Sequence, residues 1–315
     1  MQSLLDTPCD QTFIRVAEVW TPDGDLLRLT DGEYGKLSVF ADISRNASFA
    51  KGEGLPGRAW TEERPIILND LNDKSFVRSE AATGAGLTSA VAIPVFAAEE
   101  LRAVLVLFCG ADVEHAGAIE IWEDRDGKLV LDDGYYGHAQ GFADVSRTIS
   151  FGHGLGLPGC VWAANAPILM SDIGRTGAFV RGQSASEARL KTGLGVPIPV
   201  PHGRKFVLTL LSAPHTPIAR RFELWDARPQ RVGPNQRAEL IDGICEREGQ
   251  LWPQQNPPVD PKIVSAWEGP VGRILGSGQP QVLAGPTGLP EKYTQMIALP
   301  VYHETEVAYV AAWYL

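Results

Sequence analysis

The sequence predicts an α+β protein in which one unit of about 103 residues is written three times. Two landmarks recur at a nearly constant spacing and define the repeat. An apolar strand ends at a tryptophan in each unit, and a later apolar strand carries a proline; these residues are Trp20, Trp122 and Trp225, then Pro94, Pro197 and Pro300. Because the spacings within each set are 102 or 103 residues, we expect three domains at residues 1–110, 111–215 and 216–315.

Each of the first two units opens with a predicted β-hairpin. The segment "FIRVAEVW" alternates apolar and polar residues, which is typical of a strand with one buried face. The turn at 22–24 then leads into "LLRLTDG", and "DRDG" leads into "KLVLDDG" in the second unit.

A glycine-proline motif follows, as "GEGLPGRAW" at 52–60 and "GLGLPGCVW" at 154–162. Proline presets the backbone for a first helical turn, and Gly57 or Gly159 leaves room for the new helix to lie close to the sheet. A third copy surrounds Gly272. The motif therefore predicts a turn into a short helix in every unit.

The rest of the unit predicts a brief strand, a helical segment and two central strands. The helical segments contain "SFVRSEAATGAG" and "AFVRGQSASEARLKTG", and β-branched residues fill "SAVAIPVF" and "RAVLVLF". Consecutive strands joined by short turns predict an antiparallel sheet with helices on one face.

Composition limits the classes of function. The net charge of −10 argues against nucleic acid and anionic membranes as partners, and no apolar run is long enough to span a bilayer. The start "MQSLLDTPCD" does not resemble a secretory signal. Four scattered cysteines without a metal-ligand spacing predict free thiols in the cytoplasm.

No catalytic motif is found. There is no Ser-His-Asp or Cys-His arrangement, P-loop or dinucleotide fingerprint, so we assign no catalytic residue, metal or cofactor. Arg58 is expected to be a surface residue of the motif helix. Cys160 takes its place in the second unit, and we expect an inert thiol there because no neighbouring base is evident.

These motifs together resemble the GAF domain family. The likeness is strong from "GEGLPGRAW" to "RAVLVLF", nearly as good from Gly154 to Leu211, and faint in the third unit. The resemblance implies a fold related to PAS domains and a sensory or regulatory role. Family members bind cyclic nucleotides, tetrapyrroles, haem, amino acids or other small molecules, and others only dimerise.

The resemblance also places a candidate ligand site. The segment that covers the ligand cavity in GAF domains corresponds to Phe76, Arg78 and Glu80 in unit one and to Phe179 and Arg181 in unit two. An aromatic wall with one guanidinium suits a small anionic or aromatic ligand. The alternative is that each phenylalanine fills the core and each arginine pairs with a carboxylate at the surface.

Unit three departs from the pattern. Its tryptophan and motif glycine are 47 residues apart instead of 37, it gains the insert "WPQQNPPVDP", and it loses the Phe-x-Arg segment. We expect a capping or docking domain without an open ligand site, with the proline-rich insert lying across the vacated face.

Three functions follow from the sequence. The first is a bacterial tandem sensor of a small ligand that acts through a separate signalling protein, with a homodimer as one form of assembly. The second is a ligand-free assembly module. A thiol-dependent small-molecule enzyme is the third, and the lack of clustered cysteines disfavours it.

Overall fold

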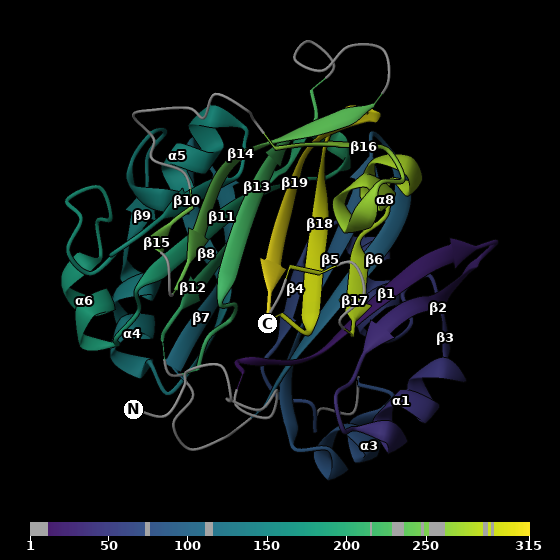
Figure 1. Ribbon diagram of the computed structural model, residues 1–315. Coiled ribbons are helices and arrows are strands. Elements are labelled where there is room, and N and C mark those ends of the chain that lie inside the picture. Colours follow the sequence, from purple (N-terminus) through teal and green to yellow (C-terminus); the bar gives the residue numbers. More distant parts are fainter. Residues whose placement is uncertain are drawn as a thin grey trace.

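The computed structural model describes residues 12–72, 76–110, 116–214, 216–228, 236–246, 249–251, 262–285, 289–290 and 293–315 of the 315-residue chain. Over these residues the chain forms three antiparallel sheets, with the helices packed on their outer faces (Figure 1). The predicted α+β class of three repeated units, each with a central antiparallel sheet, is confirmed.

The first sheet has the strand order β3-β2-β1-β6-β5-β4. Its strands are β1 (Ile14–Asp23), β2 (Leu26–Glu33), β3 (Ser48–Ala50), β4 (Ile66–Leu68), β5 (Leu87–Ala97) and β6 (Glu100–Gly110), with helices α1 (Ser38–Arg45), α2 (Gly54–Glu62) and α3 (Ser79–Gly84). Strand β1 pairs with the last strand, β6, so the two hairpins of the unit share one sheet. A bulge between Val19 and Trp20 interrupts the β1–β2 register.

The second sheet repeats this order as β9-β8-β7-β12-β11-β10. Its strands are β7 (Ala116–Arg125), β8 (Lys128–Gly137), β9 (Ser150–Phe151), β10 (Ile168–Met170), β11 (Thr192–Pro199) and β12 (Lys205–Ser212), with helices α4 (Gln140–Thr148), α5 (Gly156–Ala164) and α6 (Gly182–Glu187) and the 3₁₀ turn η3 (Pro201–Gly203). The bulge recurs between Ile121 and Trp122. Topology and irregularity are thus both repeated.

The third sheet has the order β15-β14-β13-β19-β18-β17, and β16 also pairs with β14. Its elements are β13 (Arg221–Asp226), β14 (Arg237–Cys245), β15 (Gly249–Gln250), β16 (Ile263–Ser265), α8 (Gly269–Ser277), β17 (Gln281–Ala284), β18 (Gln295–His303) and β19 (Glu306–Tyr314). The described part of unit three contains no counterpart of α1 or α3. The insert at 252–261, and with it the prediction that it crosses the vacated face, lies outside the described residues.

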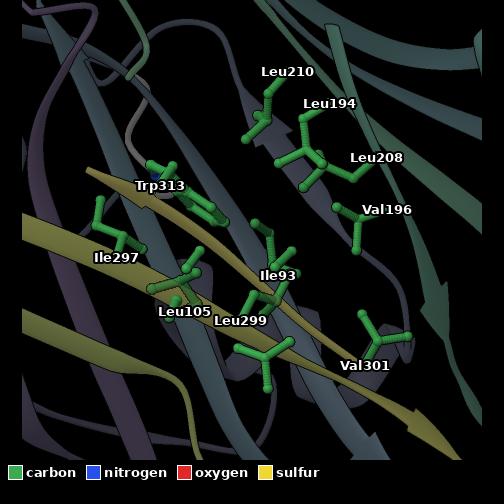
Figure 2. Packing of buried hydrophobic residues seen from close by; sticks show 14 of the residues in the cluster. Ile93, Leu105, Leu194, Val196, Leu208, Leu210, Ile297, Leu299, Val301 and Trp313 are labelled. Carbon is green, nitrogen blue, oxygen red and sulfur yellow. The ribbon is translucent and has the colours of Figure 1, made fainter. Parts of the chain in front are cut away.

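Alternate residues of each strand face two different cores. In β1, Val16 and Trp20 pack beneath the helices, whereas Ala17 and Val19 face the other two sheets. The inward faces of all three sheets meet in one central core (Figure 2). The apolar runs of the central strands are therefore explained by burial on both faces.

The three units are arranged in a ring around this core. Pro94, Pro197 and Pro300 lie together on β5, β11 and β18, which contact one another at the centre. Around the outside, β4 packs on β8, β10 on β13 and β14, and β17 on β2. Each unit therefore uses the same edge to meet the next unit, which is the geometry of an internal threefold repeat.

The glycine-proline motif is the same turn in all three units. A β-carbon on Gly57 would lie 2.1 Å from the carbonyl oxygen of Ala50, and the matching distance is 2.2 Å for both Gly159 and Gly272. The amide of Gly52 donates to the carbonyl of Gly57 at 2.8 Å, which closes the turn. Only glycine lets the helix approach the preceding strand so closely.

Candidate functional site

The predicted ligand-contact residues of unit one do not all lie together. Phe76 and Arg78 are buried beneath the turn that leads into α3, with 3% and 4% of their surfaces exposed. Glu80, in the first turn of α3, is exposed to solvent. The Phe-x-Arg spacing therefore directs two side chains into the interior, while the carboxylate stays outside.

Arg78 forms a buried, two-pronged ion pair with Glu18 of β1. Its Nη1 atom lies 2.7 Å from Glu18 Oε1, and its Nη2 atom lies 2.9 Å from Oε2. Glu18 also accepts hydrogen bonds from Trp20 Nε1 at 2.9 Å and from the Tyr34 hydroxyl at 3.1 Å, and Arg78 donates to Ser44 Oγ at 2.5 Å. Such dense pairing is what a fully buried carboxylate requires.

Aromatic rings surround this ion pair. The guanidinium carbon of Arg78 lies 5.0–5.6 Å from the centres of five rings, which belong to Trp20, Phe40, Phe49, Phe76 and Phe108. The charge is stabilised by ring faces as well as by Glu18. The guanidinium of Arg78 thus occupies the space within the aromatic wall, where a ligand was expected.

Unit two repeats the cluster. Arg181 Nη2 lies 2.8 Å from Glu120 Oε2, Arg181 also donates to Ser146, and Phe179 is buried beside the pair. Thr209 adds a hydrogen bond to Glu120 at 2.9 Å. Burial alone would raise the pKa of Glu120, but the charge and hydrogen bonds of Arg181 outweigh burial and hold that pKa below its ordinary value.

Unit three keeps the carboxylate but replaces its partner. Glu223 accepts hydrogen bonds from Trp225 Nε1 at 3.1 Å and from the Tyr314 hydroxyl at 2.7 Å. Its cation is Arg221, two residues earlier on the same strand, with Nε at 2.9 Å. An arginine within β13 thus replaces the one that the Phe-x-Arg segment supplies elsewhere.

These glutamates were not predicted from the sequence, although a signal was present. Glu18, Glu120 and Glu223 each stand two residues before the landmark tryptophan, so they recur at the period of the repeat. Each side chain is fully buried. The alternative in which each arginine pairs with a carboxylate at the surface is wrong in that detail, because the pair is internal. The proposed role of Phe76, Arg78, Glu80, Phe179 and Arg181 in binding a ligand stays a prediction.

The larger cavities of the described residues lie between units. A cleft of about 570 Å³ separates the β5–β6 turn of unit one from the end of α8. A second cleft, of about 480 Å³, separates the β18–β19 turn from the end of α5. Both clefts occupy equivalent places in the ring, where the hairpin of one unit approaches the motif helix of its neighbour.

The third equivalent place, between units one and two, is bridged by side chains. Arg204 Nη1 donates to the carbonyl oxygen of Glu62 at the end of α2, at 3.2 Å, and Nη2 lies 2.7 Å from Glu123 Oε1. His202 Nε2 lies 3.4 Å from a carboxylate oxygen of Glu63. The Arg204 hydrogen bond and the His202–Glu63 contact thus bridge this junction, whereas the other two junctions contain clefts.

The described cysteines do not gather into a reactive site. Cys109 and Cys245 are buried, burial raises the pKa of Cys109 to about 12, and the partly exposed Cys160 lies 3.3 Å from the carbonyl oxygen of Gly154. Among the described residues no group of three His, Cys, Asp or Glu side chains could hold a metal ion.

Two further predictions concern helices. The described part of the chain does not contain a helix long and apolar enough to cross a membrane. Arg58 is half-buried and pairs with Glu62 at 3.3 Å.

Comparison with known proteins matches the first unit to one family. Residues 1–119 match the family model of the GAF domain. No curated protein matches the chain.

Solved structures that are similar to parts of the chain include three proteins. They are the GAF domain of nlh2 from A. aeolicus in an inactive state (17% identity, TM-score 0.26), the free methionine-R-sulfoxide reductase of Neisseria meningitidis with its substrate (16%, 0.25) and a GAF domain/HD domain protein of Geobacter sulfurreducens (13%, 0.28). The matches cover 31%, 30% and 34% of this chain, and 59%, 52% and 70% of those chains. The chain therefore spans little more than half the length of the first two.

Proposed function

From the premise that this chain is a tandem of three GAF-like domains, the first of which matches the GAF family, we propose that it is a regulatory module that works by associating with a separate protein. GAF domains are known as small-ligand sensors and regulatory domains. In this proposal the interiors of units one and two are permanently filled, and the surface of the three-unit ring carries the function.

The observation that carries this proposal is the buried Arg78–Glu18 pair and its ring of aromatic side chains. It occupies the space beneath the Phe-x-Arg segment, and Arg181 and Glu120 do the same in unit two. A ligand could enter only if the ion pair opened. Breaking a buried ion pair is strongly unfavourable, by about 3–5 kcal/mol.

The association proposal is tested by native mass spectrometry of the freshly purified full chain, together with its copurified partners from the native host. We expect the mass of the bare polypeptide and a defined complex of fixed stoichiometry. A small molecule retained at one or two copies per chain, and lost in an Arg78→Met or Arg181→Met variant, would contradict a filled interior.

A second candidate, sensing of a small anionic ligand, is favoured by one specific observation. The Nε atoms of Arg78 and Arg181 are buried without a hydrogen-bond partner among the described residues. An unused donor beside each Phe-x-Arg segment could bind a carboxylate if the segment moved outward. Sensing predicts that small carboxylic acids raise the melting temperature of the wild type and leave that of Arg78→Lys unchanged.

A further inference from the structure

Unit three has a tryptophan at a position of the repeated turn where the other two units have glycine. Trp267 takes the place of Gly52 and Gly154: its amide donates to the carbonyl of Gly272 at 2.6 Å, as the glycines do to their motif glycines. All three residues have positive φ, +71° for Trp267 against +86° and +78°. A bulky residue is uncommon there because its β-carbon crowds the backbone.

The indole of Trp267 is also exposed, with 67% of the residue's surface accessible to solvent. Its ring lies against α8, so that a β-carbon on Gly276 would be 2.2 Å from the ring. Thr61 and Ala163 occupy the place of Gly276 in the other units. Unit three has therefore lost a side chain on its motif helix and gained an indole above it. A strained backbone and an exposed aromatic together suggest a function rather than core packing.

Trp267 is not a lining residue of the cleft between units one and three, but it lies beside residues that are. Gly276, on which the ring lies, lines this cleft of about 570 Å³. Gln236 lines it too, and its carbonyl accepts a hydrogen bond from the amide of Ala266, the neighbour of Trp267. Inside, the Tyr302 hydroxyl donates to the carbonyl of Gly278 at 2.7 Å. The cleft thus combines an aromatic border with the carbonyl end of a helix.

The charge of the cleft suits a cation. Glu100 and Glu306 line it, and its arginine, Arg102, is paired with Glu100 at 3.0 Å. The turns beside it expose two further carboxylates, Glu99 and Glu304. Carboxylates, an accessible indole face and a helix C-terminus all favour positive charge.

The chain itself shows which group suits this position. At the equivalent junction between units one and two, the guanidinium of Arg204 donates to the carbonyl of Glu62 at the end of the motif helix. In the hairpin of unit one, the cation beside the end of α8 is Arg102, which interacts with the Tyr302 hydroxyl and pairs with Glu100 at 3.0 Å. Positive charge therefore lies at the end of the motif helix at both junctions, as the partial negative charge of a helix C-terminus favours.

We propose that this cleft docks an arginine- or lysine-bearing segment of a partner protein, with a basic side chain on the face of Trp267 and others toward Glu100 and Glu306. The inference rests on the proposed function, since it names the chemistry of the associating partner. The cleft is large enough for several side chains, which favours a peptide segment.

The test uses the full chain and two probe peptides, acetyl-Gly-Arg-Gly-Arg-Gly-amide and its glutamate counterpart, in calorimetric titrations at low and physiological salt. We expect only the arginine peptide to bind. Trp267→Gly should weaken binding at least tenfold without changing net charge, and it should leave the melting temperature within a few degrees because glycine suits the positive φ. Val39→Ser, on a remote exposed position, should bind as the wild type does.

A second variant tests the docking site independently if Trp267→Gly proves unstable. Glu306→Gln should weaken the arginine peptide several-fold and reduce its salt dependence. Absence of binding, equal binding of both peptides, or unchanged affinity in both variants would overturn the docking site. The proposed function is tested separately, by the native mass of the wild type and of the Arg78 variants, and none of those peptide-binding results would change that mass. Failure of the docking site is therefore distinguishable from failure of the proposed function.

Discussion

Units one and two satisfy the same buried glutamate differently from unit three. Glu18 and Glu120 receive an arginine from a segment 60 or 61 residues further along, beneath a helix. Glu223 receives Arg221 from its own strand and a hydroxyl from Tyr314. The carboxylate therefore belongs to the sheet, whereas its cation can come from different elements. Unit three could lose the Phe-x-Arg segment because a local arginine compensates the charge.

The largest expected effect comes from removing the cation in each unit. Arg78→Met and Arg181→Met should lower the free energy of unfolding by about 3–5 kcal/mol, because each leaves a buried carboxylate uncompensated. Arg221→Met should cost less, about 1–2 kcal/mol, because the Arg221 side chain is 16% exposed and Glu223 keeps two uncharged donors. Urea denaturation of the three variants measures the difference.

A double variant sharpens this comparison. Glu18→Gln with Arg78→Met removes both charges, and it should recover part of the stability lost in Arg78→Met alone. Equal losses for Arg78→Met and Arg221→Met would show that the strand arginine is as essential as the one from the segment, and the distinction between the units would be wrong.

The next largest effect is the stability lost when the motif glycine is replaced, and it should be equal in the three units because they share the turn. Gly57→Ala, Gly159→Ala and Gly272→Ala each place a methyl group about 2.1–2.2 Å from a backbone carbonyl oxygen. We expect each to destabilise the protein by about 1–3 kcal/mol, the usual cost of overpacking. Thermal denaturation measures this. A tolerated change in unit three alone would mean that its divergence has loosened the turn as well.

The sequence was sufficient for the repeat and for the class of fold. Tryptophan, glycine and proline landmarks each reflect a local constraint, such as the strand end at Trp20 or the close approach at Gly57, and a local constraint can be read from spacing. The sequence also placed Phe76 and Arg78 on one segment. It could not show that Arg78 turns inward, because an arginine is buried only when a carboxylate 60 residues away is positioned to meet it.

The ring of three sheets could not be predicted for a related reason. The apolar runs of β5, β11 and β18 indicate burial on two faces, but several packings of three domains would bury them equally well. Nothing in the spacing distinguishes a shared central core from three separate ones. Trp267 was missed because its meaning depends on φ: the repeat places it opposite Gly52, but only the backbone angle shows that it is strained there.

A smaller effect should distinguish unit three from unit two, because Glu246 and Glu120 should make stability change with pH in opposite directions. Burial raises the pKa of Glu246, after β14, from 4.5 to about 7 despite the charges of Arg220 and Lys191. Its contribution to stability is therefore present below about pH 4.5 and is lost as pH rises through 7. Glu120, whose folded pKa is lowered, contributes above its unfolded pKa of 4.5 and loses that contribution as pH falls through its folded pKa.

The Glu246→Gln variant isolates the pH-dependent contribution of Glu246 to stability. The wild type should lose about 1–2 kcal/mol relative to the variant between pH 5 and pH 8, once solvent screening of a half-buried carboxyl is allowed for. Urea titrations at the two pH values give the comparison, and a Glu239→Gln variant provides a control at a carboxylate of the preceding strand, β14. Parallel pH profiles of wild type and Glu246→Gln would contradict the assignment.

The smallest effect concerns the residue that differs between the first two turns. Arg58 pairs with Glu62 one helical turn later, and in unit two both members of that pair are replaced, by Cys160 and Ala164. Such a pair contributes only about 0.3–0.5 kcal/mol, so its loss in unit two requires no compensation. Cys160→Ser should therefore change the unfolding free energy by less than about 0.5 kcal/mol and leave peptide binding intact. Fast alkylation of Cys160 near neutral pH, together with loss of binding in Cys160→Ser, would instead make this thiol functional and give the second turn a role that the first lacks.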